Sequence, residues 1–227
     1  MVMQLYGDPA SPYVTRVILF ARLKGLILGR PPVPGDNPRS AAYHQLNPIG
    51  KVPGLMVDGR MVPESAVICD YLEDAFPEPA GLPAAPFDRA TSRLVARITD
   101  LYISPQFQPL LPHLDPARRD PAAVVPLAAE LDKAFRSLAY FMGPGPFCVA
   151  GEPTLGDCTL GPYMQLLKNV IFPVFDSIPD PTVGEGRLVH WWQALQGHAL
   201  CREELDAYGE VVDVFMAANR ERLHEHR

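Results

Sequence analysis

The chain has 227 residues, of which 48% are hydrophobic, and a formal net charge of −6, with a mean hydropathy near zero. This composition is typical of a soluble globular protein with room for one large or two small domains. It speaks against a membrane protein, because no apolar run approaches the roughly 20 residues of a spanning helix. It also speaks against a nucleic-acid binder, which needs a basic surface.

The opening residues, MVMQLYGDP, contain neither a basic segment nor a sustained apolar run. We therefore expect no secretory signal and a cytoplasmic location. The cysteines show no paired metal-ligand spacing and are expected to be buried, reduced thiols rather than metal ligands. They are Cys69, Cys148, Cys158 and Cys201.

Residues 3–6 predict a short strand, and residues 12–24 predict a helix with apolar positions at a 3.6-residue period. Ser11 followed by Pro12 is typical of a helix start, because serine accepts a backbone N–H at the N-cap and proline has none to lose. Residues 27–40 contain four prolines, which confine any second strand there to an edge or break it altogether.

The next segment predicts a hairpin followed by a helix. Strands at Val52–Met56 and Arg60–Val62 flank Asp58-Gly59, a dipeptide typical of a two-residue turn. Glu64-Ser65 then begins an amphipathic helix. The first 77 residues are therefore expected to form a small α/β unit that a hairpin closes.

Residues 78–86 are rich in Pro, Ala and Gly and predict a linker. Beyond the linker the strand signals end, so residues 87–227 are expected to form an all-α domain. Helical periodicity covers residues 87–111, 121–142, 154–169, 186–197 and 201–223. The predicted fold class is therefore α+β, with an α/β domain at residues 1–77 followed by a helical bundle.

Three motifs in this order resemble those of the cytosolic glutathione transferases, and most closely their serine-type classes such as phi, tau and zeta. The stretch SPYVTRVILFARLKG is similar to the first-helix motif of these classes. The stretch NPIGKVPGLMVDGRMVPESAVICDYL is similar to the family signature N-P-x-G-x-V-P-x-L…E-S-x-x-I-x-x-Y-L. In GEPTLGDCTLGPYM, Thr154 and Asp157 have the spacing of a capping box at the start of the central buried helix.

The resemblance implies a thioredoxin-like first domain that binds glutathione as a co-substrate, with no metal. It implies a cis bond at Val52-Pro53 that turns the Val52 backbone outward, where it pairs with the cysteinyl unit of glutathione. Ser65, at a helix N-terminus, would hold the γ-glutamyl carboxylate, and Glu64 would face the ammonium group of the ligand or act as a counter-charge. For the glycyl carboxylate the candidate is Lys51, with two alternatives, Arg39 and His44.

Ser11 matches the serine-type catalytic residue, whose hydroxyl donates to the glutathione sulfur and favours the thiolate. Two tyrosines compete for this role, Tyr6 at the end of the first strand and Tyr13 in the helix. Counting back from Arg16-Val17 favours Ser11, because Tyr6 falls out of register with the tyrosine-type residue. No cysteine precedes Cys69, which disfavours a thiol–disulfide mechanism.

The resemblance implies an electrophile pocket between the first domain and the first helices of the second, with Tyr102, Phe107 and Leu110 in its lining. The function expected is that of a glutathione transferase acting in detoxification on a small hydrophobic electrophile, as a homodimer. Two alternatives stay open. One is a glutathione-dependent cis–trans isomerase of a maleyl-type substrate, and the other is a non-catalytic glutathione- or ligand-binding interaction protein.

Overall fold

In the computed structural model, which describes residues 2–225 and their side chains up to residue 218, the chain divides into two units, Met1–Leu82 and Pro83–Arg227. We call them the N-terminal unit and the helical unit. The first contains a three-stranded sheet with helices, and the second is helical, so the predicted fold class is confirmed.

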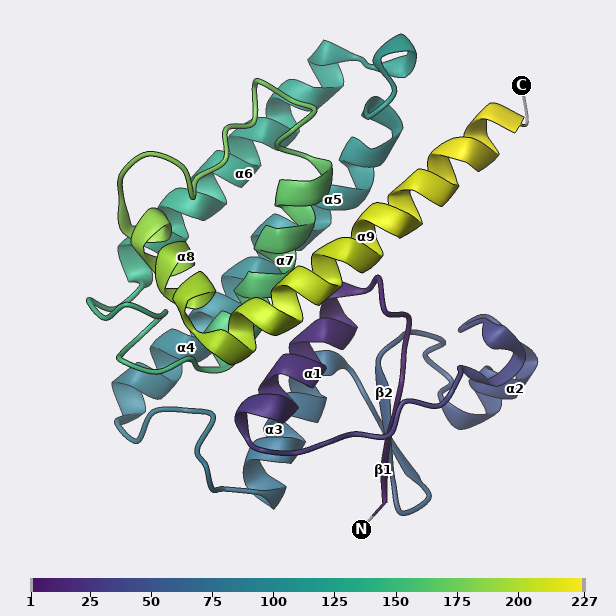
Figure 1. Cartoon of the computed structure of the whole chain (residues 1–227), viewed down its shortest axis with the longest axis vertical. Coiled ribbons are helices and arrows are strands. Elements are labelled where there is room, and N and C mark those ends of the chain that lie inside the picture. Colours follow the sequence, from purple (N-terminus) through teal and green to yellow (C-terminus); the bar gives the residue numbers. More distant parts are fainter. Residues whose placement is uncertain (1, 226–227) are drawn as a thin grey trace. The chain divides into compact units, whose positions relative to one another are not determined.

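The N-terminal unit is built on an antiparallel sheet with the strand order β1-β2-β3. Helices α1 and α3 lie on one side of this sheet and α2 on the other (Figure 1). The elements are β1 (Met3–Tyr6), α1 (Pro12–Leu23), the 3₁₀ turn η1 (Pro34–Asp36), α2 (Ala41–Leu46), β2 (Gly54–Val57), β3 (Arg60–Pro63) and α3 (Ser65–Ala75).

The hairpin between β2 and β3 turns at Asp58 and Gly59, both of which have positive φ, of 45° and 85°. Positive φ at both central residues is the requirement of a type I′ turn, which the Asp-Gly pair meets. The expected second strand in residues 27–40 is reduced to a single parallel bridge between Gly29 and Gln4. Because the prolines that follow have no N–H to donate, the ladder does not continue.

Helices α1 and α3 run in the same direction, as two contacts with the same offset of 49 residues show: buried Arg16 in α1 and buried Lys24 at the C-cap of α1 each donate to α3. The Nη1 atom of Arg16 lies 3.0 Å from the Ser65 Oγ atom, and the Lys24 Nζ atom lies 2.7 Å from the Glu73 Oε2 atom. The N-termini of the two helices therefore lie at the same end of the unit.

The Lys24–Glu73 pair also holds the end of the N-terminal unit. Lys24 Nζ donates to the Pro79 carbonyl at 2.8 Å, while Glu73 accepts from the backbone N–H groups of Gly81 and Leu82. A buried ion pair is favourable only where further hydrogen bonds satisfy its remaining groups, and here they do. This pair serves to keep residues 79–82 against α1 and α3.

The helical unit contains α4 (Pro86–Ile98), a π-helical turn η2 (Thr99–Ile103), α5 (Ser104–Leu110), the 3₁₀ turns η3 (Leu111–His113) and η4 (Pro116–Arg118), α6 (Pro121–Phe141), α7 (Leu155–Val170), α8 (Arg187–Gly197) and α9 (Ala199–Glu225). Helix α7 packs against α4, α8 and α9 (Figure 1). Residues 87–111, which the sequence predicts as one helix, are interrupted by η2, and Pro105 stands in the first turn of α5.

Asp157 is the hydrogen-bonding centre of the helical unit. It is fully buried at the third position of α7, where the predicted capping box with Thr154 is confirmed. Its Oδ1 atom accepts from the Cys148 N–H and from the Trp191 Nε1 atom, both at 2.9 Å. Its Oδ2 atom accepts from the N–H and the hydroxyl of Thr154. One carboxylate thus joins the start of α7, the preceding loop and α8.

The four cysteines are free and buried, as the sequence predicts. Burial, and then the Asp157 carboxylate, raise the pKa of Cys201 from 9.0 to about 12. The same two causes raise the pKa of Cys148 well above its ordinary value. No helix in residues 2–225 combines the length and apolar character that crossing a membrane requires.

We predict that Asp157→Ala lowers the free energy of unfolding by about 3–5 kcal/mol, because four buried donors lose their acceptor. Urea unfolding followed by circular dichroism measures this. Asp132→Ala is the matched control, because Asp132 is exposed and pairs with Arg136 one turn along α6. It should change stability by less than about 0.5 kcal/mol. Equal effects of the two substitutions would contradict the role of Asp157.

We also predict that stability falls as the pH rises above about 9. A thiol with a raised native pKa stays protonated in the folded state while the unfolded chain ionises, so each such group removes up to about 1.4 kcal/mol per pH unit. Urea unfolding over alkaline pH should show a smaller slope for Cys201→Ser than for the unsubstituted protein. An unchanged slope would contradict the raised pKa.

Candidate functional site

The register of the sheet brings three predicted segments to one end of the N-terminal unit. Tyr6 pairs with Gly54, and Gly54 pairs with Pro63. Neighbouring strands lie about 5 Å apart, so Tyr6 and Pro63 are about 10 Å apart. The loop that ends at Ser11 follows β1, Val52-Pro53 precedes β2, and Glu64-Ser65 follows β3. These three segments therefore meet at the same end, over the length of a short extended peptide.

Ser11 occupies the N-cap of α1, with Pro12 next, but its side chain makes no capping hydrogen bond. The expectation that its hydroxyl accepts a backbone N–H is therefore wrong. Its backbone N–H donates to the Asp8 carbonyl at 3.0 Å, which fixes the turn before the helix. The half-buried hydroxyl stands at the positive end of the helix dipole, where an anion is favoured.

The Val52-Pro53 bond is cis, as the family resemblance implies. Two side chains that were not predicted from the sequence as site residues hold the segment before this bond. The Lys51 carbonyl accepts from the Tyr43 hydroxyl at 3.0 Å and from the Asn47 Nδ2 atom at 2.9 Å. Both donors belong to buried residues, so two hydrogen bonds hold the Lys51 carbonyl in place just before the cis bond.

The side chains proposed for a glycyl carboxylate are all exposed, namely Lys51, Arg39 and His44. Gly50 has a φ of +65°, and a Cβ atom there would collide with the His44 imidazole. The loop thus needs glycine at this position both for its backbone conformation and for space. Lys51 follows directly, at the point where the chain enters the cis bond.

Glu64 and Ser65 differ in burial although they are adjacent. Ser65 is 6% exposed, and its Oγ atom accepts from Arg16. Glu64 is exposed, and as the N-cap of α3 it has a φ of +68° and a ψ of 116°. A non-glycine residue in such a conformation costs about 1–3 kcal/mol, and such residues cluster at ligand sites.

This end of the unit is chemically suited to an extended, anionic ligand. Two helices present their N-termini, whose dipoles attract a carboxylate or a thiolate. A hydroxyl stands at each, Ser11 on α1 and Ser65 on α3. In the described part of the chain, no group of three or more His, Cys, Asp or Glu side chains is placed to hold a metal ion.

The residues expected to line an electrophile pocket belong to the helical unit and differ in exposure. Tyr102, in η2, is 53% exposed, whereas Leu110, at the end of α5, is fully buried. Phe107, in α5, has an intermediate exposure.

Tyr6, whose hydroxyl is the alternative to that of Ser11, donates to the Gln4 Oε1 atom at 3.4 Å. The Tyr6 ring contacts the Tyr43 ring edge-to-face.

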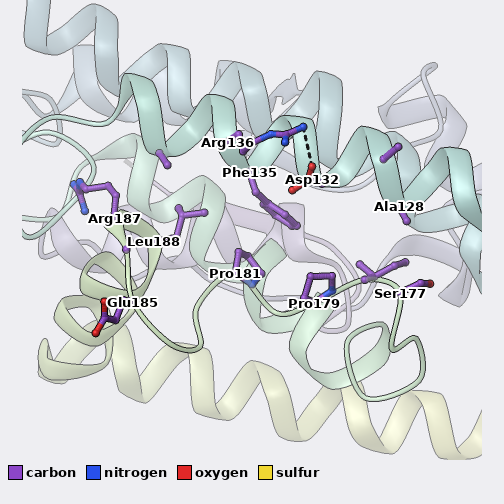
Figure 2. Close-up of a pocket in the computed structure, with 14 residues that line it drawn as sticks. Ala128, Asp132, Phe135, Arg136, Ser177, Pro179, Pro181, Glu185, Arg187 and Leu188 are labelled. Atoms are coloured by element: carbon purple, nitrogen blue, oxygen red, sulfur yellow. Dashed lines mark ion pairs between the residues drawn. The ribbon is translucent and has the colours of Figure 1, made fainter.

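A separate cavity of about 500 Å³ opens within the helical unit, between α6, residues 177–181 and the start of α8 (Figure 2). Its apolar wall includes Phe135 and Leu188, and Asp132 and Arg136 form an ion pair at its rim. Arg187 donates to the carbonyls of Gly143 and Phe147. None of the predicted site residues lines this cavity.

Comparison with known proteins gives a consistent result. A family model described as "Glutathione S-transferase, N-terminal domain" matches residues 5–80. Maleylacetoacetate isomerase of Rattus norvegicus is 30% identical over 187 residues, which cover 79% of this chain and 83% of that protein. Among solved structures, glutathione transferase Omega 3C of Trametes versicolor has a TM-score of 0.74 and 27% identity, covering 90% of this chain and 89% of that one.

A further similarity is confined to part of the chain. Maleylacetoacetate isomerase of Pseudomonas aeruginosa is 40% identical over 108 residues, which are 45% of this chain. The match spans about half the length of that relative, 51%. Similarity over half a protein supports a shared domain and leaves the reaction to be argued from the site.

The strained backbone at Glu64 leads to a prediction. Glu64→Gly should raise the free energy of unfolding by about 1 kcal/mol, because glycine adopts positive φ without the steric cost. Glu64→Ala is the matched control, since it removes the same carboxylate and keeps the strained conformation. Urea unfolding of both variants measures the difference, and equal stability of the two would show that the conformation costs little.

Proposed function

Because the chain belongs to the glutathione S-transferase family, we propose that it activates the thiol of glutathione for attack on a small hydrophobic electrophile. The observation that carries this proposal is Ser11, whose hydroxyl stands at the N-terminus of α1 and makes no capping hydrogen bond. Such a hydroxyl is available to donate to a sulfur atom placed at the helix end.

The energy of one hydrogen bond is sufficient for this activation. A hydrogen bond to a charged acceptor contributes about 1.5–3 kcal/mol, which corresponds to roughly one to two pKa units. The pKa of a free thiol is about 8.5. A decrease of this size raises the thiolate at neutral pH from a few per cent to about half. The dipole of α1 acts in the same direction.

The remaining contacts follow the geometry of the N-terminal unit. The Val52 backbone, before the cis bond to Pro53, is proposed to pair with the cysteinyl unit of glutathione. Glu64 and Ser65 are proposed to bind the γ-glutamyl end, with the carboxylate at the N-terminus of α3. Lys51 is the proposed partner of the glycyl carboxylate. The register Tyr6–Gly54–Pro63 supports this order, because it aligns the segments across the sheet.

A second candidate is a glutathione-dependent cis–trans isomerase, which the similarity to maleylacetoacetate isomerases favours. In this reaction the thiolate adds to one carbon of a conjugated double bond, rotation occurs about the resulting single bond, and the thiolate leaves as the double bond reforms. Glutathione is regenerated, whereas conjugation consumes it. Measurement of glutathione after complete turnover of the substrate therefore distinguishes the two reactions.

The proposal includes an electrophile site in the helical unit, at Tyr102, Phe107 and Leu110, and a homodimer. An exposed apolar row supports a protein interface on α4 and η2: Phe87, Leu94 and Leu101 are spaced seven residues apart and are 81%, 37% and 48% exposed. A role in detoxification in the cytoplasm would follow from conjugation of such electrophiles.

We predict that Ser11→Ala abolishes thiolate formation while glutathione still binds. Titration of glutathione at slightly acidic pH, following thiolate absorbance together with the heat of binding, separates the two effects. The unsubstituted protein should show both signals, and Ser11→Ala only the heat.

The rival hydroxyls supply the controls. Tyr6→Phe and Tyr13→Phe each remove one hydroxyl and should leave thiolate formation unchanged. Loss of the thiolate in either variant would transfer the activating role from Ser11 to that tyrosine. Binding without thiolate in the unsubstituted protein would exclude the catalytic proposal and favour a non-catalytic glutathione-binding protein.

A further inference from the structure

Two buried cations tie α1 to α3, but their acceptors differ in kind. At one end Lys24 pairs with the Glu73 carboxylate and with the backbone of residues 79–82, so its partners are structural. At the other end Arg16, which is only 1% exposed, donates from Nη1 to the Ser65 hydroxyl oxygen at 3.0 Å. Ser65 is one of the two residues proposed above to bind the γ-glutamyl end of glutathione.

The chemistry of the two groups fixes the direction of this hydrogen bond. A guanidinium has only donors, and a serine hydroxyl has one donor and two acceptor lone pairs. Ser65 must therefore accept from Arg16, which leaves its own proton free to donate elsewhere. A hydroxyl that accepts from a cation is also polarised, and it becomes a better donor to an anion.

We infer that Arg16 is a positioning residue for the γ-glutamyl carboxylate of glutathione: it orients the Ser65 hydroxyl as a donor toward that carboxylate. This inference rests on the proposed function. Arg16 donates one hydrogen bond to Ser65, and Ser65 donates one to the ligand. No proton is transferred in either contact.

Burial makes this arrangement stable. The Arg16 guanidinium lies 5.3 Å from the centroid of the Tyr13 ring, one turn earlier on the helix, so its position does not depend on solvent.

The test is a double-mutant cycle on glutathione binding, measured by calorimetry. Ser65→Ala and Arg16→Met should each weaken binding about tenfold or more, the value of a hydrogen bond to a charged group. The double variant should have about the same glutathione affinity as the single variant with the lower affinity, because both substitutions remove the same contact. Effects that multiply in the double variant would overturn the inference.

A second ligand gives a readout that a structural role would not change. The tripeptide γ-aminobutyryl-cysteinyl-glycine keeps the amine of glutathione and lacks the α-carboxylate. Arg16→Met should weaken binding of glutathione and leave binding of this analogue unchanged relative to the unsubstituted protein. Equal weakening for both ligands would assign Arg16 to general support of the fold and overturn the inference.

The controls address folding. Lys24→Met removes the buried cation at the C-cap of α1 and should lower the thermal stability while leaving the glutathione affinity unchanged. Arg16→Lys keeps a charged donor on a shorter, less rigid side chain and should recover part of the affinity lost in Arg16→Met. If Arg16→Met does not fold, the cycle is run with Arg16→Lys, which should then weaken glutathione binding and again spare the analogue.

The inference and the proposed function fail in different ways. If the unsubstituted protein does not bind glutathione, or if Ser65→Ala binds it normally, the proposed binding site itself is wrong. If Ser65→Ala binds weakly while Arg16→Met binds normally, the site stands and only the role of Arg16 is wrong.

Discussion

A slip of one residue between β1 and β2 would turn every side chain of the strand to the other face and move Gly54 away from Tyr6. The candidate site therefore depends on the observed register of the three strands. The pairs Tyr6–Gly54 and Gly54–Pro63 align the end of β1, the start of β2 and the end of β3. The pairing of three short strands thus fixes the relative positions of the loops at their common end. These loops carry the groups that would contact a ligand, as loops on a rigid scaffold commonly do.

The helices extend this alignment into the site. Because α1 and α3 are parallel, their positive ends lie together, and each carries a serine, Ser11 or Ser65. The two contacts that hold these helices have different consequences. Lys24 and Glu73 bind each other and the backbone of residues 79–82. Arg16 instead donates to Ser65, a residue of the candidate site. One pair of helices therefore combines a structural contact with a contact to a residue of the proposed ligand site.

The helical unit follows a different design, in which one buried carboxylate collects hydrogen bonds from three chain segments. Asp157 orders the start of α7, the preceding loop and α8. Nothing in this network is chemically reactive, and the buried thiols near it are held protonated by their raised pKa. Under the proposed function, the choice between conjugation and isomerisation would lie in the groups that contact the electrophile, because both proposed reactions begin with the same thiolate and a fold does not specify a reaction.

Several features were determined by the sequence alone. Asp58-Gly59 predicted the hairpin, Thr154 and Asp157 predicted the capping box, and the ordered motifs predicted the family. The hairpin and capping-box signals each lie within one turn, where the spacing of residues directly reports the backbone conformation, whereas the family signal comes from the order of three motifs along the chain. The positions of Ser11, Val52, Pro53, Glu64 and Ser65 in the chain were likewise readable from these motifs.

Only the tertiary structure decided which partners these residues have. It showed that the Ser11 hydroxyl does not cap its helix, that Tyr43 and Asn47 hold the Lys51 carbonyl, and that Arg16 donates to Ser65 across 49 residues of sequence. Sequence periodicity reports which face of a helix is apolar and is silent about a single polar contact between two elements. Such contacts arise from the packing of α1 against α3, which brings together groups that no local pattern relates.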